Sequence, residues 1–370
     1  MTIDLPSYRW FTVHALGAAK SDVDRHHNRV TPWLALFGLI LGAAPASASS
    51  VVPIAWGTDE DTGHLVRIEN YDSSPIVTDY GRLSIDDGGT VRPFPDTDTE
   101  YSDVFSDIES FTLNEQGFAY VVGNSTVDFS GGGSFASPHL YRMRIFEGDG
   151  TLAVTPDDAT ASGGYNVLES VAAIPGISSG AVNGLDFDPI SGDLYAVVEN
   201  GGRDDLVIID RLTGATTMIA ASMDGTDDVE DIQFDEYGNL YLLDDDGGAN
   251  ETDDVLLMAT LDRSGLLPSL ISISVVNNTG DDHRIESIAW DFMNQRLIGF
   301  SDESNTLFQL NTASDGYTVL GPVGFNDIEG IDFVPTSTGL PVPEPTTALL
   351  LSLGLVGLAG SRRWQRPPTT

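Results

Sequence analysis

The segment DIEGIDF (327–333) has four counterparts earlier in the chain, and this recurrence indicates a repeat fold. In each copy an apolar residue precedes Glu or Asn, and apolar residues then alternate as in a β-strand. The counterparts are DIESFTL (107–113), AVNGLDF (181–187), DVEDIQF (228–234) and RIESIAW (284–290). Successive copies lie roughly 40 to 75 residues apart, and a period of about 40–50 residues is typical of propeller blades.

Further strands follow most copies. A second strand is exemplified by GDLYAVVEN (192–200), a third by DLVIIDRLTG (205–214) and a weaker fourth by TTMIA (216–220). Asp, Asn and Gly between them supply the bends that hairpins need. We therefore predict an all-β propeller of five four-stranded blades. A sixth blade is the alternative if the widest interval, from Glu109 to Asn183, hides a degenerate blade rather than an insertion. A β-sandwich is the alternative fold.

The two ends of the repeat region complement each other. IAWGTDEDTGHLVRIEN (54–70) looks like a second and a third strand without a first, whereas residues 327–333 are a first strand without the rest. Joining them gives one blade built from both ends of the chain. This blade would close the ring.

Composition limits the function. The chain has 17 Lys and Arg against 56 Asp and Glu, a net charge of -39, so phosphates of nucleic acids would be repelled. It has no cysteine, which excludes disulfides and thiolate ligands. Any metal would have oxygen or imidazole ligands, as Ca²⁺ prefers. The zinc-protease, serine-hydrolase and P-loop signatures are absent, and His283 is the histidine nearest a repeated glutamate.

Repetition around a ring would bring the Glu or Asn of each copy close to one axis. These residues are Glu109, Asn183, Glu230, Glu286 and Glu329. Carboxylates that close repel one another unless protons or a cation neutralise them. They either hold a divalent cation, or each bonds backbone amides and ties its strand to the neighbouring blade. The acidic loop at 244–254 is a second cation candidate, with alternating oxygens and glycine as in a calcium loop. It lacks the EF-hand spacing and closing glutamate, which favours solvated surface.

The segments VNGLDFDP (182–189) and IEGIDF (328–333) resemble those of calcium-dependent propellers of the SMP-30/gluconolactonase type and of esterase-like phytase domains. The resemblance implies that the five repeated residues would hold Ca²⁺ at the mouth of the central channel. It also implies a metal-dependent hydrolase. No histidine or lysine set accompanies these residues, which favours a binding or structural role over an enzyme.

The start of the chain predicts export. The stretch RVTPWLALFGLILGAAPASASS (29–50) has an apolar segment, Trp33–Ala44, that a helix would form. Ala46-Ser47-Ala48 follows as a small-x-small site for signal peptidase, with Ala46 and Ala48 as the recognised residues.

The end of the chain has three parts in order. They are Pro343-Glu344-Pro345, an apolar stretch (346–360) expected to form a transmembrane helix, and the pair Arg362 and Arg363. This tail resembles the PEP-CTERM sorting signal. The resemblance implies processing by an exosortase, with the segment as a transient inner-membrane anchor and the body outside the cytoplasm.

These observations predict a secreted propeller that acts as a binding or structural protein of the cell surface or extracellular matrix. The alternative is a calcium-dependent esterase, phosphoesterase or lactonase using carboxylates at the channel mouth. An exopolysaccharide or a surface protein is the expected partner, and nucleic acid is not. The predicted divisions are 1–48 (extension and signal peptide), 49–337 (propeller), 338–345 (linker), 346–363 (sorting segment) and 364–370 (tail).

Overall fold

The structure, a computed structural model, describes residues 53–59, 63–87, 90–93, 107–124, 138–147, 151–154, 166–177, 182–226, 228–244, 254–279, 283–325 and 328–334. The chain divides into two compact units, Met1–Val51 and Val52–Thr370, and all described residues belong to the second. Every regular element in this described part is a β-strand. Within it, no helix long and apolar enough to cross a membrane is found. The helices predicted at 33–44 and 346–360 lie outside the described residues.

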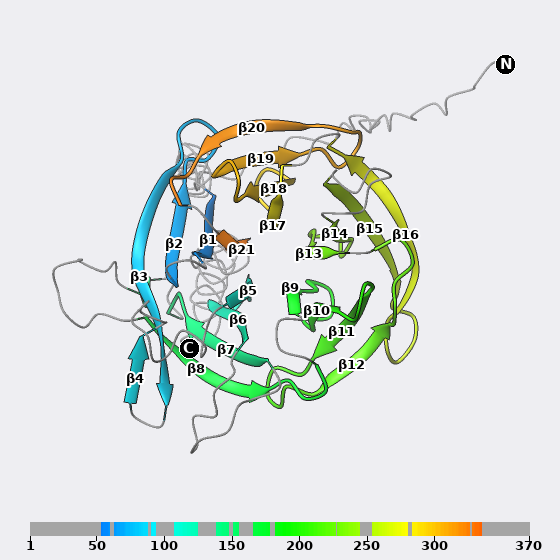
Figure 1. The fold of residues 1–370 in the computed structure, drawn as a ribbon, viewed down its shortest axis with the longest axis horizontal. Coiled ribbons are helices and arrows are strands. Elements are labelled where there is room, and N and C mark those ends of the chain that lie inside the picture. The colour runs from blue at the N-terminus through cyan, green and yellow to red at the C-terminus, as the bar shows by residue number, and fades with distance from the viewer. Residues whose placement is uncertain are drawn as a thin grey trace, which may run out of the picture. The chain divides into compact units, whose positions relative to one another are not determined.

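Five blades of four antiparallel strands are arranged around one centre in the described residues (Figure 1). Each blade is given from its inner to its outer strand. Blade 1 contains β21 (Ile328–Phe333), β1 (Ile54–Asp59), β2 (His64–Glu69) and β3 (Ile76–Asp87). Blade 2 contains β5 (Asp107–Leu113), β6 (Phe118–Asn124), β7 (His139–Arg144) and β8 (Asn166–Ala173).

The other three blades run in simple chain order. Blade 3 contains β9 (Val182–Phe187), β10 (Leu194–Glu199), β11 (Asp204–Ile209) and β12 (Thr216–Ala220). Blade 4 contains β13 (Val229–Phe234), β14 (Leu240–Asp244), β15 (Val255–Asp262) and β16 (Ser269–Asn278). Blade 5 contains β17 (Ile285–Asp291), β18 (Arg296–Ser301), β19 (Thr306–Leu310) and β20 (Tyr317–Pro322). A short strand, β4 (Thr90–Pro93), pairs with the far end of β3.

The ring closes as the sequence predicts. Strand β21 pairs antiparallel with β1, with Ala55 opposite Phe333 and Trp56 opposite Asp332. The inner strand of blade 1 therefore comes from the end of the repeat region and its other strands from the beginning. Each inner strand lies beside the inner strands of both neighbouring blades, which excludes the sandwich alternative.

The widest interval between repeats is an insertion and not a sixth blade. Between β5 and β9 the described residues contain only the strands that complete blade 2. The extra residues lie in the connections from β6 to β7 and from β7 to β8. The described residues therefore form five blades, the first of the two predicted numbers.

Blades 1 and 2 are also joined at their outer edges. Strand β3 pairs in parallel with the first part of β8, with Leu83 opposite Asn166 and Ile85 opposite Leu168. Two blades thus share one continuous sheet, and β8 crosses the boundary between them (Figure 1).

The core consists of the layers between blades, where apolar side chains of one sheet pack on the next. Trp56 and Leu65 of blade 1 share a buried cluster with Phe111 of blade 2. Tyr195 of blade 3 and Phe234 of blade 4 share another, with ring centroids 5.1 Å apart. Burial of such faces, at about 25 cal/mol for each Å² of apolar surface, holds neighbouring blades together.

The turn after the inner strand uses the same side-chain chemistry in four blades. An Asn or Asp side-chain oxygen accepts the backbone N–H two residues ahead, as in an Asx turn. The accepting residues are Asn114, Asp188, Asp235 and Asp291. These turns carry the loops at the carboxyl ends of the inner strands.

Candidate functional site

The positions predicted to line the axis are the second residues of repeated inner-strand segments. Four of their side chains are described and are half-buried: Asn183, Glu230, Glu286 and Glu329. Glu286 Oε1 lies 3.7 Å from Nη2 of Arg284. Among the described residues, no three acidic or histidine side chains lie close enough together to hold a metal ion. The Glu109 side chain is outside that part, so a calcium site built from all five residues remains a prediction.

His283 has a packing environment. Its ring centroid lies 5.1 Å from that of Phe308 in a stacked arrangement and 4.5 Å from that of Tyr317 in an edge-on one. Its backbone N–H donates to Asp254 Oδ2 at 2.9 Å. These contacts support a structural role for His283, whose ring packs on β19 and β20 of blade 5 while its backbone bonds Asp254 beside blade 4. Of the predicted acidic loop, 245–253 lies outside the described residues.

Three buried aspartates bridge the inner strands of neighbouring blades. Asp186, Asp231 and Asp332 are 3%, 3% and 2% exposed and lie on β9, β13 and β21. Each accepts a hydrogen bond from an inner-strand amide of the next blade. The donors are Phe234 N to Asp186 (2.5 Å), Ile288 N to Asp231 (2.8 Å) and Leu113 N to Asp332 (2.7 Å).

Each of these carboxylates also accepts the N–H of the residue that follows it. The three distances are 2.7 Å to Phe187 N, 2.7 Å to Ile232 N and 2.6 Å to Phe333 N. An inner strand is the edge of its blade. Its backbone amides that point away from the blade, toward the central axis, therefore have no strand to pair with. The aspartates satisfy these amides, and the amides in turn stabilise carboxylates that burial would otherwise penalise by several kcal/mol.

Shorter side chains complete the ring of ties. Thr112 Oγ1 donates to Asp186 Oδ1 at 3.0 Å and joins blade 2 to blade 3. Ser287 Oγ donates to the Ile328 carbonyl at 3.1 Å and joins blade 5 to blade 1. Together with the aspartates, these bonds tie every inner strand to the next. The residues that make these ties lie one and three positions after the repeated Glu or Asn, and the ties predicted for the glutamates themselves stay a prediction.

Asp186 and Asp332 share one hydroxyl. Thr112 Oγ1 lies 3.0 Å from Asp186 Oδ1 and 3.2 Å from Asp332 Oδ2, but it has only one proton to donate. Burial, and then the nearby charge of Asp332, raises the pKa of Asp186 well above its usual range. Burial raises the pKa of Asp332 to about 7. Because both pKa values are raised, protonation of one of the two carboxyl groups is favoured near neutral pH.

The pair lies at the base of an open pocket of about 520 Å³ where the inner strands end. Turns and loops from several blades form its wall. The lining includes Leu113, Asn114, Glu115, Gln116, Phe187, Asp188, Pro189, Ile190, Ser191, Gly192, Arg211, Glu236 and Phe292 in addition to Asp186 and Asp332. We call it the carboxyl-end pocket.

Aromatic and charged groups of this pocket are held in place by their neighbours. The Arg211 guanidinium carbon lies 5.6 Å from the centre of the Phe187 ring. Glu236 accepts the indole N–H of Trp290 at 2.5 Å, and Asp188 accepts Arg263 Nε at 2.9 Å. The pocket therefore presents aromatic faces beside fixed oxygen acceptors. The sequence did not identify it, because its residues come largely from turns whose only local signal is an Asn or Asp after four of the five inner strands.

Comparison with known proteins identifies one end of the chain. Residues 341–363 match the PEP-CTERM protein-sorting motif. The match contains Pro343, Glu344, Pro345, Arg362 and Arg363, which confirms the predicted sorting signal. A search of curated proteins found no match to the chain.

Several solved structures are similar to the chain at low identity. A chain of the nidogen/laminin complex is 10% identical with a TM-score of 0.41, covering 77% of this chain and 99% of its own. A putative gluconolactonase is 11% identical with a TM-score of 0.38, over 76% and 84%. The calcium-binding protein regucalcin of Agrobacterium tumefaciens is 13% identical with a TM-score of 0.37, over 71% of each chain. At these identities, what those proteins bind or catalyse is not transferred to this chain.

Proposed function

We propose that the protein is exported, sorted through its PEP-CTERM motif and displayed at the cell surface or in the extracellular matrix as a binding module. In this proposal the carboxyl-end pocket binds a neutral sugar unit of an exopolysaccharide. The sorting motif at 341–363 supports the location. The pocket supports the binding role, and it is the observation on which the proposal depends.

The chemistry of the pocket fits a pyranose ring. A volume of about 520 Å³ lies within the range of about 300–1,000 Å³ that small-molecule sites occupy. Phe187 and Phe292 provide flat apolar surfaces for the C–H face of a sugar, while Glu236 and the exposed Glu115 provide acceptors for its hydroxyls. Because Glu236 is already oriented by the indole N–H of Trp290, a ligand would order few side chains on binding.

A calcium-dependent hydrolase is the weaker candidate. It needs several carboxylates that converge on one ion, together with an acid or base beside them. The buried aspartates near the axis bond backbone amides instead. Among the described residues, no three acidic or histidine side chains lie close enough together to hold a metal ion.

The test is binding of neutral trisaccharides to the full chain in detergent, by saturation-transfer NMR and calorimetry. Maltotriose, cellotriose and laminaritriose are the probes. We expect at least one to bind, with its C–H protons saturated, and Phe292→Ala and Arg211→Gln to weaken it at least tenfold. Arg203→Gln is the matched control, because that arginine is exposed and pairs with Asp224 away from the pocket. Absence of binding by all three, or equal binding by the variants, would overturn the proposal.

A further inference from the structure

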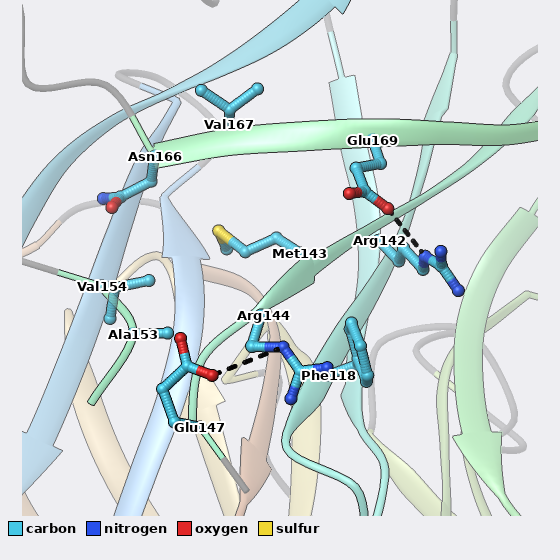
Figure 2. Close-up of a pocket in the computed structure, with 10 residues that line it drawn as sticks. All are labelled: Phe118, Arg142, Met143, Arg144, Glu147, Ala153, Val154, Asn166, Val167 and Glu169. Carbon is cyan, nitrogen blue, oxygen red and sulfur yellow. Dashed lines mark hydrogen bonds and ion pairs between the residues drawn. The ribbon is translucent and has the colours of Figure 1, made fainter. Parts of the chain in front are cut away.

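A second pocket lies on the outer part of blade 2, where β8 leaves its own blade. Strand β8 pairs with β7 as far as Arg142, opposite Glu169, and its first residues then pair with β3 of blade 1. The two strands diverge beyond this point, and a pocket of about 500 Å³ occupies the fork between them (Figure 2). We call it the fork pocket.

The base of the fork pocket is apolar. Met143 and Val154 are 3% and 7% exposed and line it together with Ala153 and Phe118 (Figure 2). Phe118 comes from the neighbouring strand β6, so three segments of blade 2 contribute to this wall. Such a surface suits the apolar face of a ring or a short aliphatic stretch of a ligand.

Two arginines of β7 line the pocket on the face that they share with Phe118, opposite to the face of Met143. Arg142 and Arg144 are two residues apart on β7 and therefore project to the same side of the strand. Their guanidinium carbons lie 5.3 Å and 4.1 Å from the centre of the Phe118 ring. One aromatic ring thus orders both cations, which reduces the entropy lost when they bind a ligand.

Each arginine is also held by hydrogen bonds or ion pairs to neighbouring oxygen atoms. Arg142 Nε donates to Glu169 Oε2 at 3.1 Å, and Arg144 Nη1 donates to the Phe146 carbonyl at 3.3 Å (Figure 2 shows the first). Arg144 Nε also lies 4.0 Å from Glu147 Oε2. A guanidinium carries five N–H groups in a planar fork, so these contacts fix its orientation and leave it further donors.

The glutamates lie further out than the arginines. The side chains of Glu169 and Glu147 are 65% and 55% exposed, against 36% and 39% for Arg142 and Arg144. Exposed ion pairs contribute about 0–1 kcal/mol, so exchanging a glutamate for a ligand carboxylate costs little. The displaced glutamate would remain solvated.

The charge of the whole protein makes this arrangement selective. With a net charge of -39, most of the surface repels anions. Two guanidinium groups ordered by one aromatic ring, in a pocket that also has apolar lining residues, offer an anion a place that the repulsive surface does not. The guanidinium fork matches the two oxygens of a planar carboxylate, and the apolar lining residues suit the ring that bears it.

We propose that the fork pocket binds the carboxylate of a uronate unit in an acidic polysaccharide, with Arg142 and Arg144 as the anion-binding residues. This site is separate from the carboxyl-end pocket and shares no lining residue with it. It would let one displayed propeller contact an acidic polymer through its outer edge while its axis binds a neutral sugar.

The experiment measures binding of trigalacturonate to the full chain in detergent by calorimetry, at two salt concentrations. We expect Arg142→Gln and Arg144→Gln each to weaken binding about tenfold, whereas Arg203→Gln leaves it unchanged. Added salt should weaken binding by the wild type more than by the variants. Glu169→Gln should strengthen binding severalfold, because it removes the competing carboxylate. That opposite sign distinguishes a site from general loss of positive charge.

Two further arms identify the group that is bound. Maltotriose, which lacks a carboxylate, should not respond to Arg142→Gln or Arg144→Gln, whatever it does at the carboxyl-end pocket. A sulfated maltotriose should bind more weakly than trigalacturonate, since sulfate is not planar. Unchanged trigalacturonate binding in both arginine variants, weaker binding in Glu169→Gln, or preference for the sulfated sugar would overturn the proposal.

Near-ultraviolet circular dichroism checks that each variant is folded. Arg211→Gln should leave this binding intact, so failure here is separable from failure at the carboxyl-end pocket.

Discussion

Carboxylates at the two ends of the inner strands differ in burial and in their hydrogen-bond partners. At the amino ends, Glu230, Glu286 and Glu329 are half-buried. Further along, Asp186 and Asp332 are almost fully buried and bond amides of neighbouring blades. Asp231, one position after Glu230, is buried in the same way and also bonds an amide of the next blade. These buried aspartates are less conspicuous in the sequence than the repeated glutamates. A repeated acidic residue in a propeller can be identified as a site or a tie only when its hydrogen-bond partners are known.

The largest effect is expected between these two ends, where the inner strands approach most closely. Gly330 has a φ of 71°, and a Cβ there would lie 2.3 Å from Phe111 N in the next blade. We expect Gly330→Ala to lower the unfolding free energy by about 3 kcal/mol or more, or to prevent folding. Denaturant unfolding measures this.

A glycine elsewhere provides the control for that substitution. Gly176 has a similar φ of 84°, but a Cβ added there would have no atom within 4 Å. Gly176→Ala should therefore cost only the backbone strain, about 1–2 kcal/mol. Equal losses in the two variants would show that close contact between inner strands does not limit stability.

The comparison between the two ends is tested most directly by removing one carboxylate from each. Asp186→Ala leaves the amides of Phe234 and Phe187 and the amide group of Gln233 without their acceptor. We expect a loss of about 3 kcal/mol in unfolding free energy. Glu230→Ala, the same truncation at an amino end, should cost less, about 1 kcal/mol, because this side chain is only half-buried. A larger loss for Glu230→Ala than for Asp186→Ala would reverse the comparison.

The pH dependence of stability gives a smaller effect of defined sign. Burial raises the pKa of Asp332 to about 7, above its usual value. The folded protein therefore binds a proton that the unfolded chain releases near pH 4, and this stabilisation is lost as the pH rises from about 4 to about 7. Each unit of pKa difference is worth about 1.4 kcal/mol, so the loss should be roughly 2–4 kcal/mol.

Asp332→Asn isolates this contribution from the general repulsion of an acidic protein. The variant cannot titrate at that position, so its unfolding free energy should fall less between pH 5 and pH 8 than that of the wild type. Urea unfolding at each pH gives both curves. Parallel curves would show that Asp332 is ionised throughout that range in the folded protein.

The strands and the closure of the ring could be predicted because they depend on local information. Alternating apolar residues and Asx turns mark each strand, and the incomplete ends at 54–70 and 327–333 reveal their shared blade. The sorting signal could also be predicted, since its three parts are contiguous.

The ties and the pockets could not be predicted in the same way. Asp186 and Asp332 lie three positions after the conspicuous Asn183 and Glu329, and side chains on a strand alternate between faces. Which face meets the next blade depends on how blades are rotated against one another. The carboxyl-end pocket combines Glu115, Arg211 and Phe292, which only the closed ring brings together. The fork pocket exists because the first part of β8 pairs with β3 of blade 1 and not with β7 of its own blade. No pattern of residues in the sequence predicts this change of partner.

The smallest effect is expected from calcium. If the amino ends formed a calcium site, a hundredfold excess of ion over Kd would raise stability by about 2.7 kcal/mol. Glu230, Glu286 and Glu329 are half-buried and keep contact with solvent, so we expect nearly equal melting temperatures with calcium and with a chelator. Thermal melting of the full chain in detergent measures this, with Glu286→Gln as the comparison. A calcium-dependent rise that Glu286→Gln abolishes would establish the predicted site, with Glu109 as the ligand that completes it. The two ends of the inner strands would then differ in function, one binding an ion and the other tying blades and binding sugar.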